Sequence, residues 1–118
     1  MATEKVTINL SSIVCNATSD GGRRKDELYL KYTADGGKET RFPANDSYSI
    51  SPDENNPWNL NLPISYADNV VISLFDSETG KDQFLGSQTY YTADASQTEN
   101  RKITNSNGAN YTLNTEQG

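Results

Sequence analysis

The fold is decided by residues 58–76, which read WNLNLPISYADNVVISLFD. In the first half, apolar and polar residues alternate from Trp58 to Ile64, a period of two that is typical of a strand with one buried face. The second half contains residues 70–75, a nearly continuous apolar run, which favours a central strand covered on both faces. The stretch therefore predicts two strands of a layered β protein.

Alternating runs of the same kind lie on both sides of this stretch. Residues 35–37, Asp-Gly-Gly, predict a tight hairpin turn because glycine accepts positive φ angles. The polar stretch 94–110 is expected to be a mobile loop, and no window has the period of an amphipathic helix. The other strand candidates are residues 6–10, 28–32, 39–42 and 84–92, with Tyr111 and Leu113 marking the last strand.

Seven or eight short strands, separated by Gly, Asn, Asp and Pro, are typical of an all-β protein built as an antiparallel β-sandwich. The chain has 118 residues and 13.0 kDa, the size of one domain. We therefore expect residues 1–118 to form a single sandwich domain. Hydrophobic residues make up only 33%, which favours a thin, two-layered core.

Charge and composition exclude several functions. The net charge of −6 argues against nucleic-acid binding, which needs clustered Lys and Arg to displace phosphate counterions. The chain has no histidine and one cysteine, so the usual general base is missing and a structural zinc site is nearly impossible. We expect a protein that is not an enzyme. Calcium, which prefers carboxylate and carbonyl oxygens, is the natural metal.

The start of the chain bears on its location. Residues 1–5 contain no apolar signal region, and no segment approaches the length needed to cross a membrane. The chain as written is expected to be cytoplasmic, with peripheral membrane association as an option. A signal peptide removed before residue 1 is the alternative.

Acidic residues gather in two loops, residues 20–27 and residues 76–83. Asp76 and Glu78 are two positions apart, so in an extended chain their side chains project to one side. Carboxylates brought together repel each other unless a cation compensates. The two loops therefore indicate a calcium site, against the simpler reading that Asp, Gly, Ser and Asn are ordinary turn formers.

Several segments resemble the calcium- and lipid-binding C2 domain family. They are residues 56–59, 70–76 and 80–86, and the spacing of Asp20-Gly21-Gly22 to Asp26, followed by residues 29–32. The resemblance implies an eight-stranded antiparallel sandwich whose loops at one end chelate calcium and dock on phospholipid head groups.

The resemblance also implies site residues. Asp20 and Asp26 would be first-loop calcium ligands, Asp76 and Glu78 would be the entry ligands of the second loop, and Asp82 would complete the site. Contacts with the membrane or partner would come from the basic residues of the same loops, Arg23, Arg24, Lys25 and Lys81.

The function expected from the sequence is a calcium-binding module that attaches to an anionic phospholipid or a protein surface through its acidic loops. The alternative is a β-sandwich adhesion or carbohydrate-binding protein in which calcium is structural. It is motivated by the abundance of Asn and Tyr, which are common in sugar-binding sites. The oligomeric state is not predicted.

Overall fold

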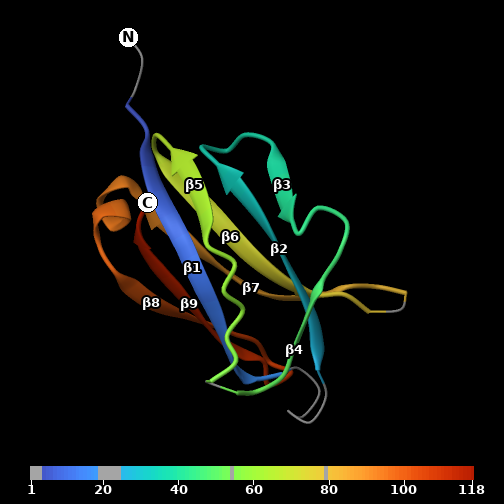
Figure 1. Cartoon of the computed structure of the whole chain (residues 1–118). Helices are drawn as coiled ribbons and strands as arrows, with labels where there is room; N and C mark the ends of the chain where they lie inside the picture. Colours follow the sequence, from blue (N-terminus) through green and yellow to red (C-terminus); the bar gives the residue numbers. More distant parts are fainter. Residues whose placement is uncertain (1–3, 19–24, 54, 79) are drawn as a thin grey trace.

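The computed structural model describes residues 4–18, 25–53, 55–78 and 80–118. Its regular secondary structure is almost entirely strand (Figure 1). The strands are β1 (Val6–Ala17), β2 (Asp26–Ala34), β3 (Glu39–Phe42), β4 (Tyr48–Ile50), β5 (Leu62–Tyr66), β6 (Asn69–Asp76), β7 (Gln83–Tyr91), β8 (Glu99–Thr104) and β9 (Asn110–Gln117), and one 3-10 helix, η1 (Thr92–Ser96), lies between β7 and β8. No helix in the described part of the chain is long and apolar enough to cross a membrane.

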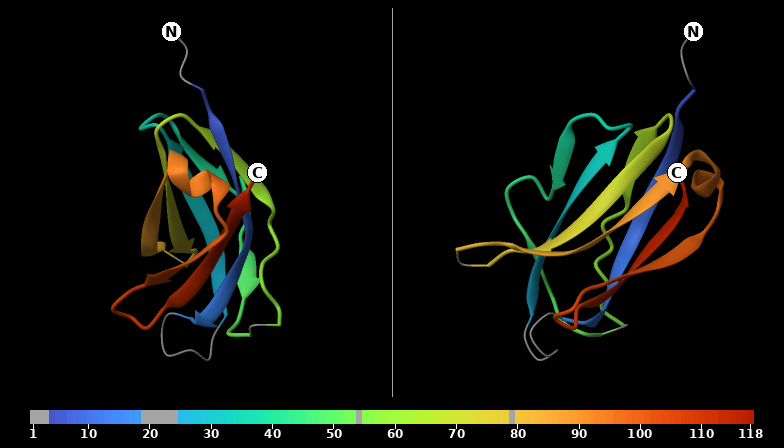
Figure 2. Two further views of the ribbon diagram at one scale, coloured as in Figure 1. Left: turned by 90° about the vertical axis from the view of Figure 1, so that its left-hand side faces the viewer. Right: turned by 180° about the vertical axis from the view of Figure 1, so that it is seen from behind.

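The strands form two antiparallel sheets. One sheet has the order β5-β1-β9-β8, and the other has the order β3-β2-β6-β7, with β4 also paired to β2. The two sheets lie face to face as the layers of a sandwich (Figure 2). The predicted antiparallel β-sandwich is confirmed, with nine strands in the described residues instead of seven or eight.

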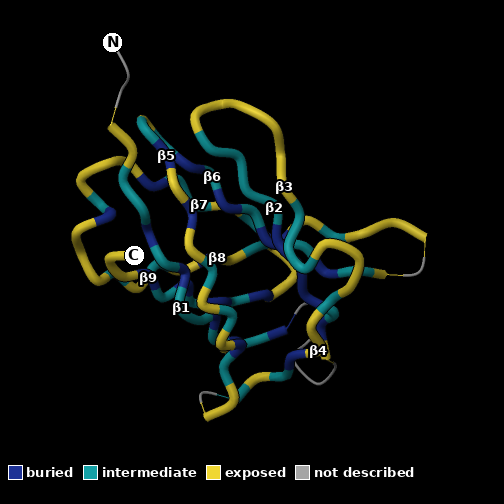
Figure 3. Tube along the Cα trace, turned by 45° about the horizontal axis from the view of Figure 1, so that its top comes forward, coloured by how far each residue is buried: buried dark blue, intermediate teal, exposed yellow. Residues whose placement is uncertain are grey.

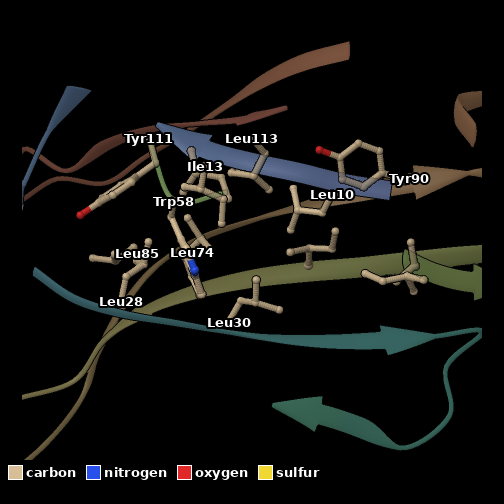
Figure 4. Close-up of a cluster of buried hydrophobic side chains, with 14 of the residues drawn as sticks. Leu10, Ile13, Leu28, Leu30, Trp58, Leu74, Leu85, Tyr90, Tyr111 and Leu113 are labelled. Carbon is tan, nitrogen blue, oxygen red and sulfur yellow. The ribbon is translucent and has the colours of Figure 1, made fainter. Parts of the chain in front are cut away.

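The core lies between the two sheets. In β6, every second residue is buried, so Val70, Ile72 and Leu74 face the opposite sheet while Val71 and Phe75 are only half-buried on the outer side. Figure 3 shows the same alternation along the other long strands, with exposed turns between them. Figure 4 shows side chains from both sheets meeting in this core.

The expectation of a mobile loop over residues 94–110 was wrong. The segment begins within η1 and contains β8, which pairs with β9 from Glu99 to Thr104. Ile103 is the one buried side chain of β8, so the apolar period that reveals a strand is missing. Polar contacts replace it: Arg101 donates to the Glu99 carboxylate at 3.1 Å and to the backbone oxygen of Thr89.

The alternation from Trp58 to Ile64 belongs to a broken strand. Trp58 exchanges two backbone hydrogen bonds with Ile13, each of 2.9 Å, in an isolated bridge. At Asn61 the backbone turns through a φ of +45°, and β5 starts only at the next residue. The Trp58 ring nevertheless packs in the core, where it stacks with the rings of Phe42 and Tyr48.

Candidate functional site

Two predicted ligands, Asp26 and Asp76, lie together at one end of the core. Asp26 is the first residue of β2, and Asp76 is the last residue of β6, its neighbour in the sheet. Asp76 pairs with Leu28, so Asp26 is its diagonal neighbour on the same face, a relation that brings Cα atoms to about 7–8 Å. Both residues are buried, with 2% and 5% of their surface exposed.

Hydrogen bonds fix both carboxylates. The hydroxyl of Tyr111, which comes from β9 in the opposite sheet, donates to Oδ2 of Asp26. The backbone N–H of Glu27 donates to Oδ1 of Asp76 at 2.8 Å. The backbone N–H of Ser77 in turn donates to the oxygen of Glu27 at 2.7 Å. Asp26 and Asp76 are thus held in place at the ends of β2 and β6 by these hydrogen bonds.

The environment of Asp76 disfavours its ionised form. Burial raises the pKa of Asp76 to about 7, and the nearby charges of Asp26 and Glu78 act in the same direction. The hydrogen bond from the Glu27 N–H acts against them. Near neutral pH this carboxyl is therefore partly protonated, and a cation beside it would favour the carboxylate.

The C-terminal end of β1 lies at the same end of the core. Burial raises the pKa of the Cys15 thiol to about 11, so the predicted buried cysteine is a poor nucleophile at neutral pH. Thr18, which follows β1, is buried, and its hydroxyl has no hydrogen-bond partner among the described residues. A cavity of about 200 Å³ lined by Cys15, Asn16, Pro52 and Asp53 lies beside them.

The structure does not bring Asp82 to this pair. Its Oδ2 accepts a 2.5 Å hydrogen bond from the hydroxyl of Tyr29, and its Oδ1 accepts the backbone N–H of Glu78 at 3.1 Å. The Tyr29 ring stacks on Phe75 at 5.2 Å, on the outer side of the sheet. The Tyr29 hydrogen bond is the main reason that the pKa of Asp82 is lowered. Asp82 thus lies on the face opposite to Asp76.

Three of the remaining predicted residues lie outside the strands of the described structure. Glu78, Lys25 and Lys81 are exposed. Asp20, Arg23 and Arg24 lie outside the described residues, so their predicted roles are not addressed by the geometry.

Sequence reasoning missed the two tyrosines that hold the acidic residues, Tyr29 and Tyr111. Each was recognised only as part of an alternating strand. The available signal was chemical: a tyrosine on a buried face needs a partner for its hydroxyl. The alternation identifies the face, but it gives no information on which carboxylate lies opposite.

The described acidic residues offer the type of ligand atom that calcium prefers, but too few of them for a complete site. Among the described residues, no three His, Cys, Asp or Glu side chains are grouped to hold a metal ion. Asp26, Asp76 and Glu78 offer only oxygen, which is what calcium prefers. A complete set of about 6–8 oxygens would need further donors from residues 19–24, backbone carbonyls and water.

Comparisons with known proteins agree with the fold. No protein-family model and no curated protein matches the sequence. A solved structure described as a C2 domain matches with a TM-score of 0.58 and 13% identity, over 94% of this chain and 96% of that one. The C2A domain of a plant Extended Synaptotagmin 1 matches with a TM-score of 0.57 and 13% identity, over 98% and 95%.

A calcium-bound structure of Extended-Synaptotagmin 2, with its C2A and C2B domains, matches with a TM-score of 0.64 and 15% identity. The match covers 98% of this chain and 45% of that two-domain chain. The fold of the protein is therefore that of a C2 domain.

Proposed function

We propose that this C2-fold module binds calcium at the end of the sandwich where Asp26 and Asp76 lie, and that bound calcium lets this end dock on anionic phospholipid. The observation that carries the proposal is the buried diagonal pair, in which burial and the charge of Asp26 raise the pKa of Asp76. Two ionised carboxylates this close repel each other, and a divalent cation bound beside them would weaken that repulsion.

The proposed ligands are the carboxylates of Asp26, Asp76 and Glu78, together with Asp20 from the loop before β2. The buried Thr18 hydroxyl is a further oxygen next to that loop. Asp82 would join only after its carboxylate leaves Tyr29. The calcium-bound C2 domains of Extended-Synaptotagmin 2, which share this fold, support the choice of metal.

The proposed docking residues are basic and belong to the same loops: Arg23, Arg24, Lys25 and Lys81. Lys25 directly precedes Asp26, and Lys81 lies in the β6–β7 hairpin, which projects from the sandwich (Figure 1). Each would add a modest, salt-sensitive attraction to an anionic surface. Calcium would be required as well, because the chain carries a net charge of −6.

Thermal melting in EDTA and in millimolar calcium tests the metal site, with magnesium as the ion control. The wild type should gain several degrees in calcium, because a ligand that binds only the folded state stabilises it. The Asp76→Ala, Glu78→Ala double variant should lose this gain. The control is the Glu4→Ala, Glu116→Ala variant, which also removes two carboxyl groups, but from exposed positions elsewhere. An equal calcium-induced gain in both double variants would contradict the proposed site.

Sedimentation with vesicles tests the partner. Phosphatidylcholine vesicles with phosphatidylserine should pull down the protein in calcium but not in EDTA, and pure phosphatidylcholine vesicles should not. Calcium-induced stabilisation without vesicle binding would support the metal site and leave a protein or a glycan as the partner. A calcium-dependent signal on a glycan array would then favour the carbohydrate-binding alternative.

A further inference from the structure

The hydrogen bond between Tyr111 and Asp26 links the two sheets at the proposed calcium site. Tyr111 belongs to β9 and Asp26 begins β2, so the contact joins residues that are 85 positions apart in the chain. Figure 4 shows the Tyr111 ring reaching from its own strand toward the strand that carries Leu28. The Asp26 carboxylate, at the start of β2, is thus oriented by a side chain of the opposite sheet.

Tyr111 lies in the interior of its sheet. It is fully buried, and β9 is paired on both sides, with Cys15 of β1 and Ile103 of β8 opposite Tyr111. Burial, followed by the hydrogen bond to Asp26, raises the pKa of the phenol above its ordinary range.

We infer that Tyr111 is a positioning residue of the proposed calcium site, because its hydroxyl fixes the direction of the Asp26 carboxylate from the opposite sheet. The inference rests on the proposed function. A carboxylate has about four acceptor sites, so one hydrogen bond from Tyr111 is compatible with metal ligation by the same group. Groups that orient a ligand in this way typically change metal affinity by about 10- to 100-fold when they are removed.

The deciding variant is Tyr111→Phe, which keeps the ring and removes only the hydroxyl. Its matched control is Tyr66→Phe. Tyr66 is also fully buried, and its hydroxyl donates to the backbone oxygen of Tyr91 at 2.8 Å. Tyr66 pairs with Val6, at the opposite end of β1 from the position that pairs with Tyr111. Each variant removes the hydroxyl of a buried tyrosine together with its hydrogen bond, but only Tyr111→Phe loses a contact to a proposed ligand.

Calcium titration calorimetry on the full chain gives the readout. Tyr111→Phe should weaken calcium binding by about 10- to 100-fold, while Tyr66→Phe should bind like the wild type. Adding Tyr111→Phe to Asp26→Asn should cause little further loss, because the hydroxyl acts through that carboxylate. If Tyr111→Phe is too unstable for calorimetry, the calcium-induced rise of its thermal midpoint is compared with that of Tyr66→Phe.

Two results would overturn the inference, and they differ. Equal calcium affinity in Tyr111→Phe, Tyr66→Phe and the wild type would make the hydroxyl a purely structural group, with the calcium site intact. Absence of calcium binding by the wild type would overturn the proposed function first, and the inference with it.

Discussion

Tyr29 holds Asp82 on the outer side of the five-stranded sheet, through a 2.5 Å hydrogen bond from its hydroxyl to Oδ2. Asp76, at the start of the same hairpin, is buried on the inner side. The two acidic residues that the sequence assigns to one calcium site are therefore separated by the sheet itself. For Asp82 to join a calcium ion bound by Asp76, the hairpin would have to rearrange and the Tyr29 contact would have to break.

The first prediction concerns this contact. Tyr29→Phe should tighten calcium binding several-fold, because it removes a hydrogen bond that competes with the metal for Asp82. Calcium titration of the variant checks it. The control is Asp82→Asn in the Tyr29→Phe background, which should lose the gain. An unchanged affinity in Tyr29→Phe would remove Asp82 from the set of ligands.

The second prediction is the pH dependence of calcium binding. The pKa of Asp76 is raised to about 7 in the fold, from 3.8, so the folded state binds more protons than the unfolded state between these values. The calcium-free protein should therefore lose stability as the pH rises from about 4 to about 7. The stabilisation by calcium should grow over the same range, because the ion must displace the Asp76 proton.

Thermal midpoints in EDTA and in calcium, measured from about pH 4 to about pH 8, check this. The two curves should diverge as the pH rises. Asp76→Asn, which does not titrate, should flatten the EDTA curve. Parallel curves for the wild type would mean that calcium does not bind where Asp76 titrates.

The third prediction concerns Asp35, in the turn that follows β2. Its carboxylate accepts hydrogen bonds from the backbone N–H groups of Ala67 and Asp68, in the turn after β5, and of Asn69, the first residue of β6. These bonds lower its pKa, so its contribution to stability is present above about pH 4 and is lost as the pH falls through the folded value. Asp35→Ala should lower the thermal midpoint at pH 7, and Asp35→Asn should lower it less.

Melting curves at pH 7 and pH 3 separate the effect of the Asp35 charge from the effect of its hydrogen bonds. Asp68→Ala is the control, because Asp68 is exposed and its carboxylate contacts only the neighbouring Asn69 side chain among the described contacts. The difference between wild type and Asp35→Asn should shrink at pH 3. A midpoint of Asp35→Ala equal to that of Asp68→Ala would contradict the role of the carboxylate.

How much of the fold could be predicted from the sequence depended on whether each strand shows an alternating pattern of apolar residues. The period of two and the Asp-Gly-Gly turn at residues 35–37 were sufficient to predict the β-sandwich, because a strand with one buried face shows alternating apolar and polar residues in its own sequence. The structure places a turn at Asp35 and Gly36, between β2 and β3. β8 was missed because an edge strand with one buried side chain, Ile103, has no apolar period.

The candidate site was predictable only in part, because it is made by pairing between strands. Asp26 and Asp76 stood out as acidic residues beside strands, but their diagonal relation follows from the register of Leu28 with Asp76. The partners Tyr29 and Tyr111 come from packing across a sheet and across the core. Sequence spacing carries no information on such contacts.

The last prediction tests the junction of the hairpin with β8. At Gly86 the register between β6 and β7 shifts by one residue, a β-bulge, and φ is +141°. A β-carbon there would lie 2.5 Å from Cγ2 of Ile103. Gly86→Ala should therefore destabilise the protein. The strained backbone conformation alone costs about 1–3 kcal/mol, and the clash with Ile103 adds to this cost.

Chemical denaturation checks this, with Gly80→Ala as the control. Gly80 also has a positive φ, +96°, but open space around its β position, so it reports the backbone strain alone. Combining Gly86→Ala with Ile103→Ala should recover the part of the loss that comes from the clash, relative to the sum of the single variants. If Gly86→Ala costs no more than Gly80→Ala, the close approach of β7 to β8 is softer than the 2.5 Å contact implies.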